Sequence, residues 1–120
     1  MARAYVSRRA LLQIDEIDQH SISCWGDEVA ASDLNDLFAA IQRLESSPDL
    51  LRRRRDFSVR LRFYRVRQHT LVCDVLNGDI FVLAVWQGAM DLPDRLERLE
   101  PQLVEEAELM ARRIENRGGD

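Results

Sequence analysis

Residues 57–92 read FSVRLRFYRVRQHTLVCDVLNGDIFVLAVWQGAMDL and contain three consecutive segments with the composition of β-strands. In residues 57–64, apolar and polar side chains alternate, which predicts a strand with one buried face. The second segment ends at Asn77-Gly78, the dipeptide that most readily adopts the positive φ angles of a type I′ turn. We therefore expect a tight hairpin here. The unbroken apolar run 80–86 predicts a strand inside the sheet that is covered on both faces.

Helices that could provide this cover come before the three strands. Ser7 can cap a helix over residues 8–23, and Ser32 can cap a second helix over residues 33–46. Both segments have apolar residues at helical spacing, and Pro48 would end the second one. We expect the two helices to pack together on one face of the sheet.

The two ends of the chain add one strand and one helix. Residues 2–6 form a short segment that could pair with the sheet. At the other end, Pro93 and Pro101 stand where first-turn prolines belong, and the segment 101–116 has an amphipathic pattern with an acidic polar side. The predicted order β-α-α-β-β-β-α, with an antiparallel sheet and a C-terminal helix, belongs to the α+β class. The terminal helix could pack on its own domain or form a homodimer.

This order of elements, the arginine-bearing strand and the phrase VLAVWQGAMDLPDRL (82–96) together resemble the RelE/ParE superfamily of toxins from bacterial type II toxin-antitoxin modules. The resemblance covers roughly residues 2–96. It implies that residues 1–99 form the toxin domain, with the helix and tail of residues 100–120 as part of the same single domain. It also implies a cognate antitoxin protein and one of two targets, because RelE-like members cut messenger RNA on the ribosome whereas ParE-like members inhibit DNA gyrase.

The composition agrees with one intracellular domain. The chain has 120 residues, and its longest apolar run is too short for a membrane span or a signal peptide. We therefore expect a cytoplasmic protein with no membrane partner. Cys24 and Cys73 have no metal-ligand spacing, so we expect both to be small core residues, with no metal and no cofactor.

The charges are unevenly distributed along the chain. The net charge is −4, yet all eight arginines of the middle third lie between residues 52 and 67. Such a cluster favours recognition of carboxylates or phosphates. The alternative is a solvated loop at Arg52–Arg55 and strand arginines that pair with the acidic helices. The predicted binding face comprises Arg52, Arg53, Arg54, Arg55, Arg60, Arg62 and Arg65.

A nuclease would need more than arginines. Attack by a 2′-hydroxyl on phosphate requires a base, an acid and a cation, and arginine supplies only the cation. The candidate set is Arg60, Arg62 and Tyr64, which should share one face of a strand, although Tyr64 could equally be a half-buried aromatic residue. We expect His20 and His69 to be helix-end and turn residues, and Trp86 and Gln87 cannot exchange protons.

The sequence therefore favours a ParE-like toxin that acts by binding and is neutralised by its antitoxin. One alternative is a ribosome-dependent endoribonuclease of the RelE type. The other is a degenerate, non-toxic relative that serves as a protein-interaction module.

Overall fold

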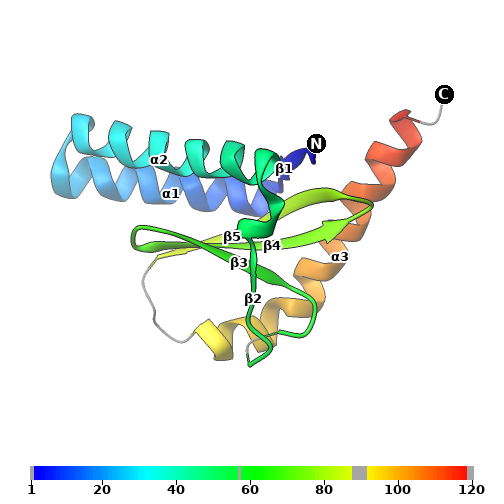
Figure 1. Cartoon of the computed structure of the whole chain (residues 1–120). Coiled ribbons are helices and arrows are strands. Elements are labelled where there is room, and N and C mark those ends of the chain that lie inside the picture. Colours follow the sequence, from blue (N-terminus) through cyan, green and yellow to red (C-terminus); the bar gives the residue numbers. More distant parts are fainter. Residues whose placement is uncertain (1, 57, 88–91, 119–120) are drawn as a thin grey trace.

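The predicted hairpin forms the centre of the sheet in the computed structural model, which describes residues 2–56, 58–87 and 92–118 (Figure 1). Asn77 and Gly78, at its turn, have φ angles of 55° and 81°, as a type I′ turn requires. The elements are, in chain order, β1 (Ala4–Val6), α1 (Arg8–Trp25), α2 (Asp27–Ser46), η1 (Pro48–Leu50), β2 (Arg52–Arg53), β3 (Arg62–Val66), β4 (His69–Leu76), β5 (Asp79–Gln87) and α3 (Leu92–Gly118).

The sheet has the strand order β1-β5-β4-β3-β2. Because β5 lies between β1 and β4, the prediction of an interior strand over residues 80–86 is confirmed. The expectation of a purely antiparallel sheet is wrong, since β1 pairs with β5 in parallel, with Ala4 opposite Ile80. No turn joins these two strands, so nothing local in the sequence fixes their relative direction. β2 is a further strand that the sequence did not predict, and it is formed by two residues of the segment Arg52–Arg55, for which a solvated loop was one interpretation.

The strand predicted over residues 57–64 begins later than expected. The hydroxyl of Ser58 accepts hydrogen bonds from the backbone N–H groups of Arg60 and Leu61, at 3.2 and 3.0 Å. These bonds form a local turn in place of a sheet ladder. As a result, Ser58 is buried and Val59 is 82% exposed, the reverse of the predicted alternation.

The two N-terminal helices form a hairpin connected by a single residue, Gly26. Its φ of 91° lies in the left-handed region that favours glycine. Ser7 caps α1 as predicted, accepting a hydrogen bond from a first-turn N–H at 3.1 Å. Ser32 is not a cap, because α2 already begins at Asp27. Asp27 and Glu28 in the first turn suit the positive end of the helix dipole, which helps to explain the earlier start.

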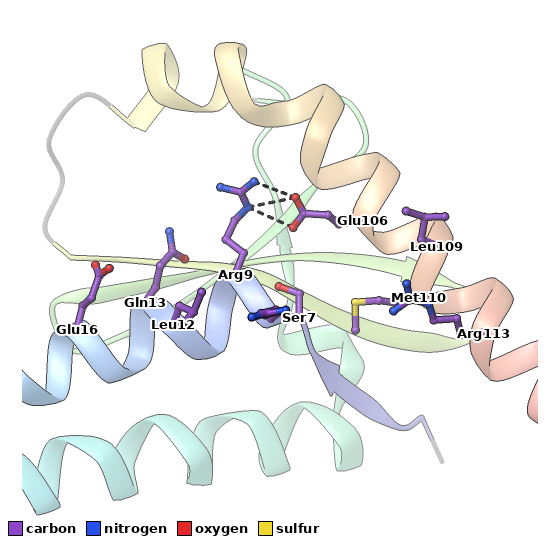
Figure 2. A pocket seen from close by; sticks show the side chains of 10 residues that line it. Ser7, Arg9, Leu12, Gln13, Glu16, Glu106, Leu109, Met110 and Arg113 are labelled. Atoms are coloured by element: carbon purple, nitrogen blue, oxygen red, sulfur yellow. Dashed lines mark hydrogen bonds and ion pairs between the residues drawn. The ribbon is translucent and has the colours of Figure 1, made fainter.

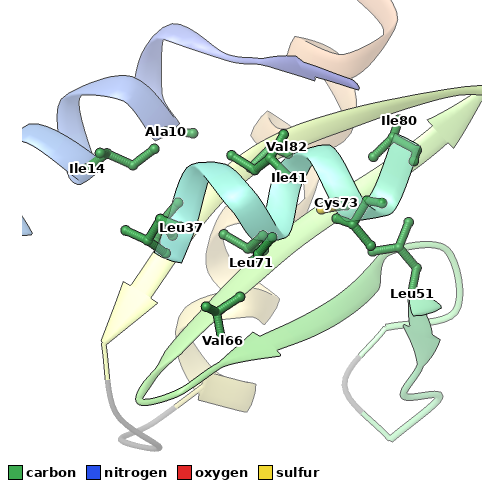
Figure 3. Packing of buried hydrophobic residues seen from close by; sticks show 13 residues of the cluster. Ala10, Ile14, Leu37, Ile41, Leu51, Val66, Leu71, Cys73, Ile80 and Val82 are labelled. Atoms are coloured by element: carbon green, nitrogen blue, oxygen red, sulfur yellow. The ribbon is translucent and has the colours of Figure 1, made fainter. Parts of the chain in front are cut away.

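The sheet separates two apolar clusters. Figure 3 shows the cluster between the α1–α2 hairpin and the sheet, where Leu37 and Ile41 of α2 meet Leu71 and Val82 of the strands. The second cluster lies between the opposite face and α3, and it contains Phe81 and other bulky side chains. Both faces of β5 are therefore covered, which accounts for its continuous apolar sequence.

Helix α3 is longer than the predicted segment 101–116. It starts at Leu92, so Pro101 lies inside the helix and not in its first turn. A proline removes one backbone hydrogen bond, and Figure 1 shows the helix changing direction along its path beneath the sheet. Leu103 and Ala107 are fully buried, so the predicted apolar stripe packs on the chain's own sheet. Phe57 of the predicted strand and residues 88–91 of the quoted phrase lie outside the described residues. None of the described helices is both long and apolar enough to cross a membrane.

Candidate functional site

Arginines line the end of the sheet formed by β2 and β3. Among the described strands, β2 is the last in the order and has a neighbour on one side only. Arg53 of β2 lies directly opposite Arg62 of β3 in the antiparallel register. Over the residues that the structure describes, neither of these two guanidinium groups forms an ion pair. Like charges in directly opposite positions are unfavourable, so an anionic group bound here would be stabilising.

Most of the predicted binding face belongs to this region. Arg54 pairs with Asp56 at 2.9 Å, and its hydrogen bond lowers the pKa of that carboxyl. Arg65 donates to the backbone carbonyl of Arg67 at 2.9 Å. We call the whole region the basic edge, and it comprises Arg52, Arg53, Arg54, Arg55, Arg62 and Arg65.

Arg60 does not belong to the basic edge. Its guanidinium lies 2.8 Å from the carboxylate of Asp74 on β4 and 3.0 Å from that of Glu108 on α3. The Asp74 side chain is only 3% exposed, so the pair neutralises a buried charge, and the hydrogen bond to Asp74 raises the pKa of Arg60. For Arg60, the alternative prediction of an arginine that pairs with an acidic helix is therefore correct. The expectation that Arg60 shares a face with Arg62 is wrong.

The candidate catalytic set of Arg60, Arg62 and Tyr64 is not assembled in the structure. Tyr64 packs partly buried against the cluster under α1 and α2, and Arg62 shares its face because the two are separated by one residue in β3. Arg60 lies on the α3 side. Asp74, which sequence reasoning did not single out, could have been recognised as a lone acid within an apolar strand, since a buried carboxylate requires a partner.

His69 and Cys24 differ from their predictions, whereas Cys73 does not. His69 is the first residue of β4 and is buried, and burial lowers its pKa although the nearby charge of Asp33 acts in the opposite direction. His20 is exposed on α1 beside Cys24, with 3.6 Å between the sulfur and Nε2. Cys24 is thus a surface residue, contrary to our expectation, whereas Cys73 is buried as predicted, and burial raises the pKa of its thiol. The described residues contain no group of three potential metal ligands.

A groove runs between α1 and α3 beside β5 (Figure 2). It consists of two adjoining hollows of about 610 and 670 Å³ that share Gln13 and Glu16. Arg9 of α1 reaches across to Glu106 of α3, with 2.9 Å between Nη2 and Oε2. Gln13 also accepts a hydrogen bond from the backbone N–H of Val85 at 2.8 Å. Sequence reasoning missed this groove because Arg9 and Glu106 are 97 positions apart.

The helical hairpin on a mixed five-stranded sheet, with arginines at the end of that sheet, is the arrangement expected from the resemblance to the RelE/ParE superfamily of toxins. A family model described as "ParE toxin of type II toxin-antitoxin system, parDE" matches residues 5–92. The chain therefore belongs to the ParE toxin family. The matched region ends where α3 begins.

Comparison with other proteins agrees with this fold. One similar solved structure is described as "Chromosomal ParDE TA system from P. aeruginosa", with a TM-score of 0.66 and 18% sequence identity. The similarity covers 74% of this chain and 98% of that one. At this identity the likeness concerns the fold alone. No curated protein matches the chain by sequence.

Proposed function

We propose that this chain acts in the cytoplasm as a growth-inhibiting toxin that works by binding its target and is neutralised by a cognate antitoxin. The observation that carries the proposal is the position of Arg60. It is fixed by Asp74 and Glu108 on the face opposite Tyr64. A ribonuclease of the predicted kind would need this cation beside its proton-transfer groups.

The antitoxin would bind along the basic edge as an acidic segment that becomes ordered on binding. Arg53 and Arg62 form the centre of this contact, since their charges face each other and neither forms an ion pair in the described part of the chain. Carboxylates placed between them would form charge-assisted hydrogen bonds, which are roughly twice as strong as neutral ones. A disordered acidic segment is suited to a strip of this kind because it can follow an extended surface.

The target favoured by membership of the ParE family is DNA gyrase. The RelE-like alternative, cleavage of messenger RNA on the ribosome, would have to use groups other than the predicted set. Trp86, near the end of β5, is buried and Gln87 is exposed, and neither side chain can donate or accept the protons of a cleavage reaction.

Induced expression tests this proposal directly. The chain should arrest growth when expressed alone, and co-expression of the small antitoxin encoded beside it should restore growth. Messenger RNA from arrested cells should be intact, and Tyr64→Phe should arrest growth as the unmodified chain does. Codon-dependent cuts that disappear in Tyr64→Phe would establish the nuclease instead. Full growth without the antitoxin would indicate a non-toxic interaction module.

A homodimer through α3 is the remaining partner hypothesis. The buried stripe of α3 is already occupied by the chain's own sheet, so a dimer would have to use the distal part of the helix. There Leu109 is 41% exposed and Ile114 is partly buried. Sedimentation of the purified chain over a range of concentrations would detect such a dimer.

A further inference from the structure

The α1–α2 hairpin carries an exposed apolar surface that the fold does not use. Its tip, where the two helices meet at Gly26, projects past the end of the sheet (Figure 1). Trp25 is 69% exposed there, Val29 is 44% exposed and Ile22 is 37% exposed. All three lie within about one helical turn of Gly26. Tryptophan is among the residues that most often dominate binding energy in protein interfaces.

Ile22 and Trp25 continue an ordered stripe along α1. Leu11, Asp15, Asp18, Ile22 and Trp25 follow one another at steps of four, three, four and three residues, which places them on one face of the helix. We call this set the α1 stripe. It is distinct from the neighbouring buried face, which contains Ala10 and Ile14. The α1 stripe therefore has apolar ends and two carboxylates between them.

The charge around the stripe restricts what can bind to it. Residues 10–42 contain no arginine or lysine. Two of their acidic residues, Asp33 and Asp36, pair with Arg67. The other acidic residues are Asp15, Glu16, Asp18, Asp27 and Glu28. Nucleic acid and anionic lipid surfaces are repelled by such a charge. The acidic segment expected at the basic edge is excluded for the same reason. Two copies that met through the same stripe would bring their carboxylates together, which is also unfavourable.

We propose that the α1 stripe and Val29 dock on the cellular target of the toxin, at a protein surface where an apolar groove is flanked by arginine or lysine side chains. A rigid helix with regularly spaced apolar residues suits a groove of this kind. The single-residue connection at Gly26 holds the two helices in a fixed relation, so little conformational freedom is lost on binding. This proposal rests on the proposed function and assigns the target and the antitoxin to different surfaces.

The test separates growth arrest from antitoxin binding. Trp25→Ala and the double variant Asp15→Arg/Asp18→Arg are compared with controls of matched type elsewhere, namely Val59→Ser, which removes an exposed apolar side chain, and Glu97→Arg/Glu105→Arg, which reverses two exposed charges on α3. The inducer level that halves growth should rise about tenfold or more in the two stripe variants, as expected for the loss of an interface hot spot. It should not change in the controls. The affinity for the antitoxin and the melting temperature should stay the same in all four.

Full growth arrest by both stripe variants would overturn the proposal while leaving the proposed function intact. Absence of arrest by the unmodified chain would overturn both. A concentration-dependent dimer in the unmodified chain that Trp25→Ala converts to monomer would assign the stripe to a second copy and also overturn the proposal. Loss of antitoxin affinity in the stripe variants would do so as well, because it would place the antitoxin on this surface.

Discussion

Arg60 and Arg62 are two positions apart, yet the fold uses them differently. Arg60 turns toward α3 and neutralises the buried carboxylate of Asp74, whereas Arg62 stays at the basic edge opposite another arginine. The turn made by the Ser58 hydroxyl is what separates them, because it prevents the strand from extending back to Arg60. A cluster of like charges in a sequence therefore does not by itself indicate a binding surface, because a member such as Arg60 can neutralise a buried charge instead.

Substitutions of the two arginines should differ most in their effect on the stability of the folded chain. Arg60→Ala leaves Asp74 buried without its cation, a loss that typically costs 3–5 kcal/mol, and we expect a value near the lower limit, about 3 kcal/mol, because the Arg60 side chain is 36% exposed. Arg62→Ala should change the free energy of unfolding by no more than about 0.5 kcal/mol. Urea denaturation of both variants measures this difference. Equal losses would mean that Arg62 is also a structural partner.

The next effect concerns antitoxin binding, for which we expect Arg62 to matter more than Arg60. Arg53→Glu/Arg62→Glu should weaken antitoxin binding by about tenfold or more, since each hydrogen bond to a charged group contributes about 1.5–3 kcal/mol. The remaining affinity should depend less on salt concentration, because fewer charges meet at the interface. Titration calorimetry at two salt concentrations measures both quantities. Arg112→Glu, an exposed charge reversal on α3, is the control and should bind normally.

A smaller effect should appear as acid sensitivity on the α2 side of the sheet. Burial lowers the pKa of His69, so the folded chain takes up this proton less readily than the unfolded chain does. The unfolded state then binds more protons below the ordinary histidine pKa of about 6.5, and stability decreases as the pH falls through that value toward the folded pKa. Above this range His69 is neutral in both the folded and the unfolded state, so it does not contribute to the pH dependence of stability. His69→Gln should reduce the slope of unfolding free energy between pH 7.5 and pH 5.5, and an unchanged slope would show that His69 is not its source.

The smallest effect is expected from relieving the repulsion between Arg53 and Arg62. Arg62→Thr in the free protein should raise the free energy of unfolding by a few tenths of a kcal/mol, the size of a cross-strand pair interaction. The same variant should bind the antitoxin more weakly. Loss of stability on this substitution would mean that the guanidinium makes a favourable contact in the free chain.

The features predicted correctly from the sequence are those that depend on local chemistry. Asn77-Gly78 determines its own turn, and the apolar run of β5 reflects burial on both faces, whichever elements provide it. The errors arose where distant residues decide the outcome. The direction of β1 depends on β5, and Arg60 is positioned by Asp74 and Glu108, neither of which is its neighbour in sequence. The sequence predicted the arginines of the basic edge, but it did not predict that Arg60 would pair with a buried carboxylate instead of joining them.

The parallel pairing of β1 with β5 also has a consequence for the order in which the chain folds. Ala4 leaves the ribosome before its partner Ile80, which emerges 76 residues later. Until then the edge of the sheet cannot close, because the two segments must first be brought together across that long stretch of chain. The α1–α2 hairpin can form while synthesis continues, since its contacts are local. A truncated product that stops before β5 would contain the helices and strands β2 to β4, but it would lack the strand that joins them to β1, so it could not acquire the folded form.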